Sequence, residues 1–119
     1  MNSDLVKVLL IDHDPERRKE RISILKNNGY KIFPALYIQP DRCKPGVYDL
    51  IVVNSIWQPE TALEFCDSIR VEDPAQAILL MVGTAVQLPR RDYMVSDTPE
   101  QLLERIESMF KKANIVKAA

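Results

Sequence analysis

Three nearly uninterrupted apolar runs constrain this chain more than any other feature of its sequence. They cover residues 5–11, 50–53 and 77–82, and polar stretches, some with helical periodicity, separate them. A strand that is apolar along its whole length needs cover on both faces, which is typical of a parallel sheet between helices. The length of 119 residues, without a repeat or a linker, predicts a single domain over residues 1–119.

Two shorter segments complete the predicted sheet. Residues 31–35 contain Pro34, which cannot donate a hydrogen bond to a strand ladder, so this strand is expected at a sheet edge. Residues 93–95 form a short fifth strand. Strands that alternate with helices predict an α/β, flavodoxin-like three-layer fold, with five parallel strands in the order 2-1-3-4-5.

Capping signals mark the expected helices. Asp14 followed by Pro15 is typical of a helix start, and Gly29 is typical of a helix end. A second helix is expected over residues 59–70, and the last one follows a capping box that begins at Thr98. The stretches after the second and fourth strands are too short for ordinary crossover helices, so both crossovers are predicted to be shortened.

Charge and composition exclude several classes of function. Sixteen Lys and Arg against seventeen Asp and Glu give a net charge of -1, which argues against binding of nucleic acid. The apolar runs are far shorter than the ~20 residues that a bilayer requires, and the first residues do not resemble a signal peptide. Cys43 and Cys66 have neither disulfide-framework nor metal-ligand spacing. We therefore expect a cytoplasmic protein with no membrane partner.

The predicted sheet gathers polar residues at the carboxyl ends of its strands, where such sheets bind ligands. These residues are Asp12, His13, Asp14, Asn54, Thr84 and Ser96. In order and spacing, VLLIDHDPERR, NGY, YDLIVVN, ILLMVGTA and YMVSDTPEQLLERI resemble a response-regulator receiver domain of two-component signalling. The resemblance implies an aspartate after the third strand that accepts a phosphoryl group, two acidic residues that hold Mg²⁺, a hydroxyl after the fourth strand and a lysine after the fifth.

The chain departs from that pattern at three positions. Asn54 stands at the phosphoacceptor position, His13 at the second acidic position and Ser96 at the lysine position, whereas Asp12 and Thr84 match. Phosphotransfer needs an anionic nucleophile and a cation to neutralise the transferred group, and an amide cannot form a stable acyl phosphate. Mg²⁺ prefers carboxylate oxygens to imidazole. The sequence therefore predicts a degenerate pocket without its metal, without a cofactor and without catalysis.

Each polar residue of this pocket also has a plainer interpretation. Asn54 is expected to hydrogen-bond Asp12, Thr84 or loop amides, and deamidation at Asn54–Ser55 is the alternative. His13 could join Asp12 and Asp14 in a transition-metal site, although a polar turn residue is the favoured interpretation. The pocket's formal charge is expected to rest on Asp12 alone, with no counter-cation.

Several residues around the pocket are candidates for contact with a partner. Tyr93 matches the switch aromatic of receivers, or is simply an aromatic at the sheet edge. Trp57 is expected to anchor an interface or to cover the pocket. The cluster of Arg17, Arg18 and Arg21 is interpreted as a solvated helix face, with partner docking as the alternative.

Three functions are compatible with these residues. The favoured one is a receiver-like module that binds a protein partner, such as a sensor kinase or an output protein, without phosphorylation and without a phosphorylation-driven dimer. The second is a working receiver phosphorylated at Asp12, Asp14 or Ser55. The third, a small flavodoxin-like ligand-binding protein, is disfavoured because the chain has no glycine-rich phosphate loop. The oligomeric state stays open.

Overall fold

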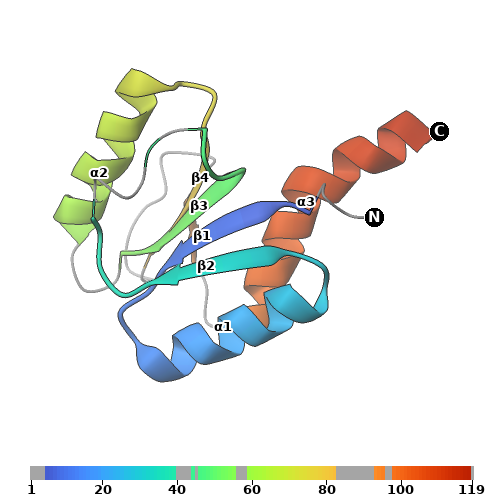
Figure 1. Ribbon diagram of the computed structural model, residues 1–119, viewed down its shortest axis with the longest axis horizontal. Coiled ribbons are helices and arrows are strands. Elements are labelled where there is room, and N and C mark those ends of the chain that lie inside the picture. Colours follow the sequence, from blue (N-terminus) through green and yellow to red (C-terminus); the bar gives the residue numbers. More distant parts are fainter. Residues whose placement is uncertain are drawn as a thin grey trace.

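The computed structural model describes residues 5–39, 44, 46–55, 59–82, 93–95 and 98–118. Its elements are β1 (Lys7–Ile11), α1 (Pro15–Asn27), β2 (Lys31–Ala35), β3 (Leu50–Asn54), α2 (Pro59–Glu72), β4 (Ala77–Val82), β5 (Tyr93–Val95) and α3 (Pro99–Ala118). The strands are parallel and lie in the order β2-β1-β3-β4-β5. Helices α1 and α3 cover one face of the sheet and α2 lies on the other (Figure 1). The predicted α/β class, layering and strand order are confirmed.

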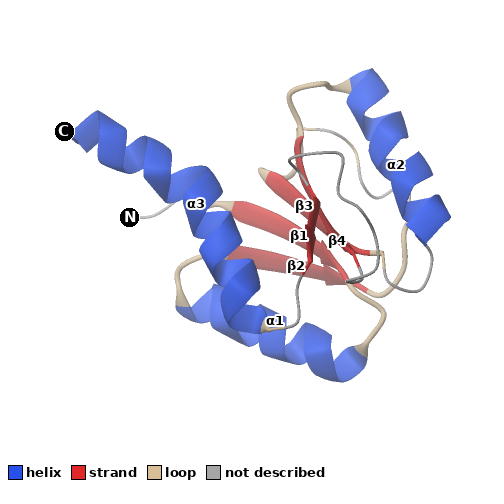
Figure 2. Ribbon diagram, turned by 180° about the vertical axis from the view of Figure 1, so that it is seen from behind, coloured by secondary structure: helices blue, strands red, loops and turns tan. Residues whose placement is uncertain are grey.

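The sheet is the middle layer because its central strands are apolar on both faces. Along β1, Val8 and Leu10 pack toward α1 and α3, whereas Leu9 and Ile11 pack toward α2. Figure 2 shows these helices on the two sides of the sheet. Strand β3 alternates in the same way and its first four residues are fully buried. Two hydrophobic clusters result, one on each side of the sheet, and they hold the ends of the strands in fixed positions.

Local signals in the sequence set the bounds of α1. The Asp14 carboxylate accepts hydrogen bonds from the backbone N–H groups of Glu16 (3.1 Å) and Arg17 (3.3 Å), as an N-cap does. At the other end, Gly29 has a φ of 92°, a left-handed conformation that side chains other than glycine rarely adopt. Both predicted helix signals are confirmed.

The predicted capping box at the start of α3 is also formed. The backbone N–H of Gln101 donates to the Thr98 hydroxyl (3.1 Å), and the Gln101 side chain accepts from the backbone N–H of Thr98 (3.3 Å). Two N–H groups that the helix cannot bond by itself are thereby satisfied. The side chains of Leu102 and Ile106 then lie fully buried against the sheet.

Strand β2 lies at the sheet edge, as Pro34 predicts. The backbone N–H of Lys31 donates to Val6, and the Ala35 carbonyl accepts from the N–H of Asp12, both at 2.9 Å. Backbone groups of a strand alternate between its two sides, so Pro34 turns its nitrogen away from β1. The missing donor therefore costs the ladder no hydrogen bond.

The connection from β2 to β3 contains no helix among its described residues, 36–39, 44 and 46–49, in agreement with the predicted shortening. The connection from β4 to β5, residues 83–92, lies outside the described residues, so the prediction for the fourth crossover stays a prediction. Within the described part of the chain, no helix combines the length and the apolar character needed to cross a membrane.

Candidate functional site at the carboxyl end of the sheet

Asp12 and Asn54 meet where β1 and β3 end. Ile11 lies opposite Val53 in the register of these strands, so the next residue of each comes to the same edge of the sheet. Asn54 donates from its Nδ2 to Oδ1 of Asp12 at 3.1 Å. Of the partners expected for Asn54, Asp12 is confirmed, whereas Thr84 lies outside the described residues.

The polar atoms of Asp12 are all engaged by the protein. Its side chain is fully buried, and Oδ1 also accepts from the backbone N–H of Asp14 at 3.1 Å. Oδ2 forms an ion pair and hydrogen bond with Nη1 of Arg21. The carbonyl oxygen accepts from Nη1 of Arg18 at 3.1 Å, and the backbone N–H donates to Ala35. No oxygen of this carboxylate is left facing solvent for a metal ion.

Arg21 corrects two expectations from the sequence. It was expected on a solvated or docking face of the first helix, but it is only 1% exposed and lies four residues before the fully buried Leu25. Residues four apart share one face of a helix, so α1 turns Arg21 toward the sheet. This spacing is the signal in the sequence that could have found it.

The second correction concerns the charge of the pocket. The sequence indicated an Asp12 carboxylate without a counter-cation, because Ser96 stands at the lysine position. Arg21 supplies that cation from α1 instead, at the Oδ2 atom of Asp12. A guanidinium suits a buried carboxylate because it stays charged and its donors are held in a fixed plane. The pair is therefore neutral as a unit without any metal.

The other two arginines of the cluster differ from Arg21. Arg18 is half-buried and holds the Asp12 carbonyl, whereas Arg17 has 53% of its side chain exposed and lies 3.7 Å from Asp14. Arg17 fits the predicted solvated face. A docking role for Arg17 or Arg18 stays a prediction.

Of the three alternative phosphoacceptors, Ser55 and Asp12 are buried, whereas the Asp14 side chain is 37% exposed. Ser55 is 2% exposed and its hydroxyl donates to the carbonyl of Met81 at 2.6 Å. Asp14 is bound to the first N–H groups of α1 as its cap. Asp12 is buried in the ion pair with Arg21. Each of these three residues already has a hydrogen-bonded role in the fold.

The predicted transition-metal alternative finds no support in geometry. Among the residues that the structure describes, no group of three or more His, Cys, Asp and Glu side chains could hold a metal ion. His13 is half-buried in the turn after β1. Its interpretation as a polar turn residue stays a prediction.

Four predicted site residues lie wholly or partly outside the described structure. Trp57, Thr84 and Ser96 lie outside the described residues, and of Tyr93 only the place in β5 is described. Their roles as interface anchor or lid, hydroxyl, lysine replacement and switch aromatic remain predictions.

A second buried polar cluster, which the sequence did not indicate, lies at the amino end of the sheet. Gln76 is 7% exposed, and its Oε1 accepts from the backbone N–H of Gly46 at 3.0 Å. Its Nε2 donates to the carbonyls of Tyr48 and Ala77, each at 3.1 Å. One carboxamide thus ties the connection before β3 to the start of β4.

Comparison with known proteins identifies the fold but no close relative. No protein-family model and no curated protein sequence matches the chain. Among solved structures, it is similar to a CheY-like response regulator receiver domain protein from Methanospirillum hungatei, with a TM-score of 0.73 and 18% identity over 92% of this chain and 96% of that one. A response regulator from Thermotoga maritima gives a TM-score of 0.69 and 20% identity over 90% and 98% of the two chains.

A longer protein shares the same unit. The response regulator DrrB from Thermotoga maritima, an OmpR/PhoB homolog, gives a TM-score of 0.74 and 16% identity over 92% of this chain. The match spans 54% of the DrrB chain, about half of its length. Three-dimensional agreement at such low identity, together with the order of strands and helices, leads to one conclusion. The chain has the fold of CheY-like response-regulator receiver domains.

Proposed function

We propose that this chain is a receiver-like domain of a two-component signalling system that acts through contact with a protein partner and is not phosphorylated at position 54. The observation that carries the proposal is the Asp12 carboxylate, which is fully buried and bound by Arg21, Asn54 and the Asp14 backbone. The Asp12 carboxylate, held in this way, is not free to coordinate a metal ion.

The chemistry at position 54 supports the same conclusion. The Asn54 amide nitrogen donates to Asp12, and its lone pair is delocalised into the carbonyl. The side chain is therefore not a nucleophile for phosphorus, and the adjacent cation is a guanidinium already paired with Asp12. Both requirements of aspartyl phosphotransfer are absent from this part of the proposed site.

Intact-protein mass spectrometry tests the proposal directly. The chain is incubated with acetyl phosphate and Mg²⁺, beside a receiver domain that carries an aspartate at the corresponding position as a positive control. We expect no species heavier by about 80 Da, the mass of one phosphoryl group, while the control acquires one. A labelled chain would contradict the proposal, and fragment mapping would then identify Asp14 or another acceptor.

An Asn54→Asp variant separates the contribution of the side chain from that of the surrounding pocket. If the paired Arg21 keeps metal away from Asp12, this variant also stays unlabelled under the same conditions. A labelled variant would mean that the pocket still supports transfer and that only the replacement at position 54 prevents it. Arg17→Ala, on the exposed face of α1, is the matched control because it leaves the Asp12 cluster intact.

The partner, in this proposal, is a protein such as a sensor kinase or an output protein, and the domain itself is not an enzyme. The net charge of -1 supports a protein partner rather than nucleic acid. Binding that does not depend on phosphorylation predicts the same affinity for the partner with and without acetyl phosphate. Affinity that rises on treatment would favour a working receiver instead.

A further inference from the structure

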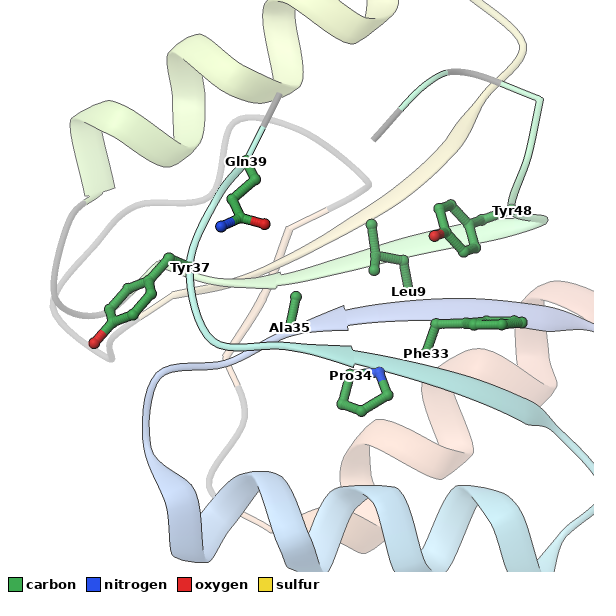
Figure 3. Close-up of a pocket in the computed structure, with 7 residues that line it drawn as sticks. All are labelled: Leu9, Phe33, Pro34, Ala35, Tyr37, Gln39 and Tyr48. Carbon is green, nitrogen blue, oxygen red and sulfur yellow. The ribbon is translucent and has the colours of Figure 1, made fainter. Parts of the chain in front are cut away.

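A cavity of about 280 Å³ opens over β1 and β2, on the face of the sheet that α2 covers only in part (Figure 3). It adjoins the Asp12 cluster through Ala35, whose carbonyl accepts from the Asp12 N–H, but no side chain of that cluster lines it. Its lining is formed by Leu9, Phe33, Pro34, Ala35, Tyr37, Gln39 and Tyr48. The cavity lies where the connection from β2 to β3, which contains no helix among its described residues, crosses the sheet.

The described residues of the lining are aromatic, aliphatic or amide side chains, and the Lys31 ammonium lies over the Phe33 ring, 5.6 Å from its centroid. Leu9 and Ala35 rise from the strands into the cavity in Figure 3. At one end, the rings of Phe33 and Tyr48 pack edge to face, with centroids 5.3 Å apart and an interplanar angle of 61°. This arrangement presents flat apolar walls to an occupant.

Two polar groups stand at opposite ends of the cavity. The carboxamide of Gln39 points toward Ala35 from one end, and the hydroxyl of Tyr48 points toward Leu9 from the other (Figure 3). Neither group has a hydrogen bond to another described residue, whereas the Tyr48 backbone carbonyl is held by Gln76. A carboxamide and a phenol each carry a donor and an acceptor with which to orient a ligand.

We propose that this cavity binds a small, neutral, planar aromatic molecule of one or two rings with a polar group at each end. A cation would meet the positive charge of Lys31 near the Phe33 ring, and an anion would trade its hydration for that one exposed, hydrated ammonium. The volume suits this class, because a cavity of roughly 150 Å³ already holds benzene. Tyr37, with 67% of its surface exposed, lies at the mouth and leaves a path from solvent. The proposal is independent of whether position 54 is phosphorylated.

The full chain titrated with a naphthalenediol, whose two hydroxyls lie at opposite ends of the ring system, tests the proposal by heteronuclear NMR. We expect saturable shifts of the backbone signals of the lining residues, with those of Leu102 and Ile106, on the opposite face of the sheet, unmoved. The corresponding naphthalene disulfonate has the same planar body with two negative charges, and it should bind at least about tenfold more weakly. Shifts that map elsewhere, or equal affinity for the disulfonate, would overturn the proposal.

Variants of the lining sharpen the test. Ala35→Leu fills the cavity from its floor and should weaken binding at least about tenfold, whereas Ala75→Leu makes the same change at an exposed turn and should leave it unchanged. Tyr48→Phe and Gln39→Leu each remove one polar group and should weaken binding about fivefold.

Thermal unfolding shows whether the Ala35→Leu variant folds. If it does not, the affinities of Tyr48→Phe and Gln39→Leu for the naphthalenediol provide the test. Unchanged affinity in a folded Ala35→Leu variant, or in both Tyr48→Phe and Gln39→Leu, would refute the assignment.

Discussion

Two clusters of buried polar side chains lie at opposite ends of the same sheet and are built in different ways. The carboxyl-end cluster consists of Asp12, Arg21 and Asn54 and contains a full ion pair. The amino-end cluster is centred on Gln76, a neutral side chain that bonds only to backbone groups. Both connect segments that are distant in sequence.

The contrast shows what each end of the sheet requires. Joining two loops needs only matched donors and acceptors, and the carboxamide of Gln76 supplies them without the cost of burying a charge. A buried ion pair gains little over apolar packing, so it is poor evidence of selection for stability alone. The ion pair stands at the carboxyl end, where sheets of this type bind ligands. There, the positive charge beside the Asp12 carboxylate is the Arg21 guanidinium.

The largest expected effect comes from removing the cation of the carboxyl-end cluster. Arg21→Met should lower the free energy of unfolding by about 3–5 kcal/mol, because the Asp12 carboxylate stays buried without its partner. Denaturant titration measures the loss, with Lys19→Met on the exposed side of α1 as the control. In the double variant with Asp12→Asn, part of the lost free energy of unfolding should be recovered. A loss below about 1 kcal/mol would mean that the pair is not buried as described.

A smaller loss is expected at the amino-end cluster. Gln76→Leu keeps the approximate size of the side chain but leaves the Gly46 N–H and the Tyr48 and Ala77 carbonyls without this partner. The cost should be about 2 kcal/mol in the free energy of unfolding, since no charge is stranded. If Gln76→Leu proved as costly as Arg21→Met, the proposed difference between the clusters would not hold.

A new charge in the carboxyl-end cluster should act through pH. Asn54→Asp places a second carboxylate beside Asp12, and the like charge raises the pKa of the new carboxyl above its unfolded value. The variant should be about 1–2 kcal/mol less stable than the wild type at neutral pH, and the gap should narrow on acidification as the folded state binds a proton. Asn54→Ala, with no new charge, should show no such trend in unfolding measured from neutral to acidic pH.

The smallest effect is expected at a solvent-exposed contact of the amino end. Asp49 is exposed, and its carboxylate accepts from the backbone N–H of Lys7 at 2.8 Å. Asp49→Ala should change the free energy of unfolding by at most about 0.5 kcal/mol, because water can replace the acceptor. A loss similar to that of Gln76→Leu would show that solvent exposure does not determine how much stability is lost with these hydrogen bonds.

Much of the fold could be predicted because its signals are local. Each signal acts within a few residues and is found where the sequence predicts it. These signals are the three apolar runs, the Asp14 cap, the Thr98 capping box and the edge proline Pro34. The pairing of Asn54 with Asp12 could also be predicted, as one of the expected partners, because parallel strands bring their ends together.

The role of Arg21 could not be predicted in the same way. Its sequence neighbours are charged, so the local pattern indicates a solvated face, and only the helical spacing to Leu25 points inward. The cavity over β1 and β2 depends on how a connection without helical periodicity crosses the sheet, which no local rule fixes. Gln76 likewise bonds to residues about 30 positions earlier in the chain.

The orientation of Pro34 has a consequence for the behaviour of the protein in concentrated solution. An unprotected outer strand offers a row of N–H groups to which further molecules can add, one after another, as in fibre growth. In β2 that row is interrupted at Pro34, the fourth of its five residues, because a ring carbon replaces the hydrogen at the proline nitrogen. The exposed edge of β2 is therefore a poor template for the addition of a strand from another molecule.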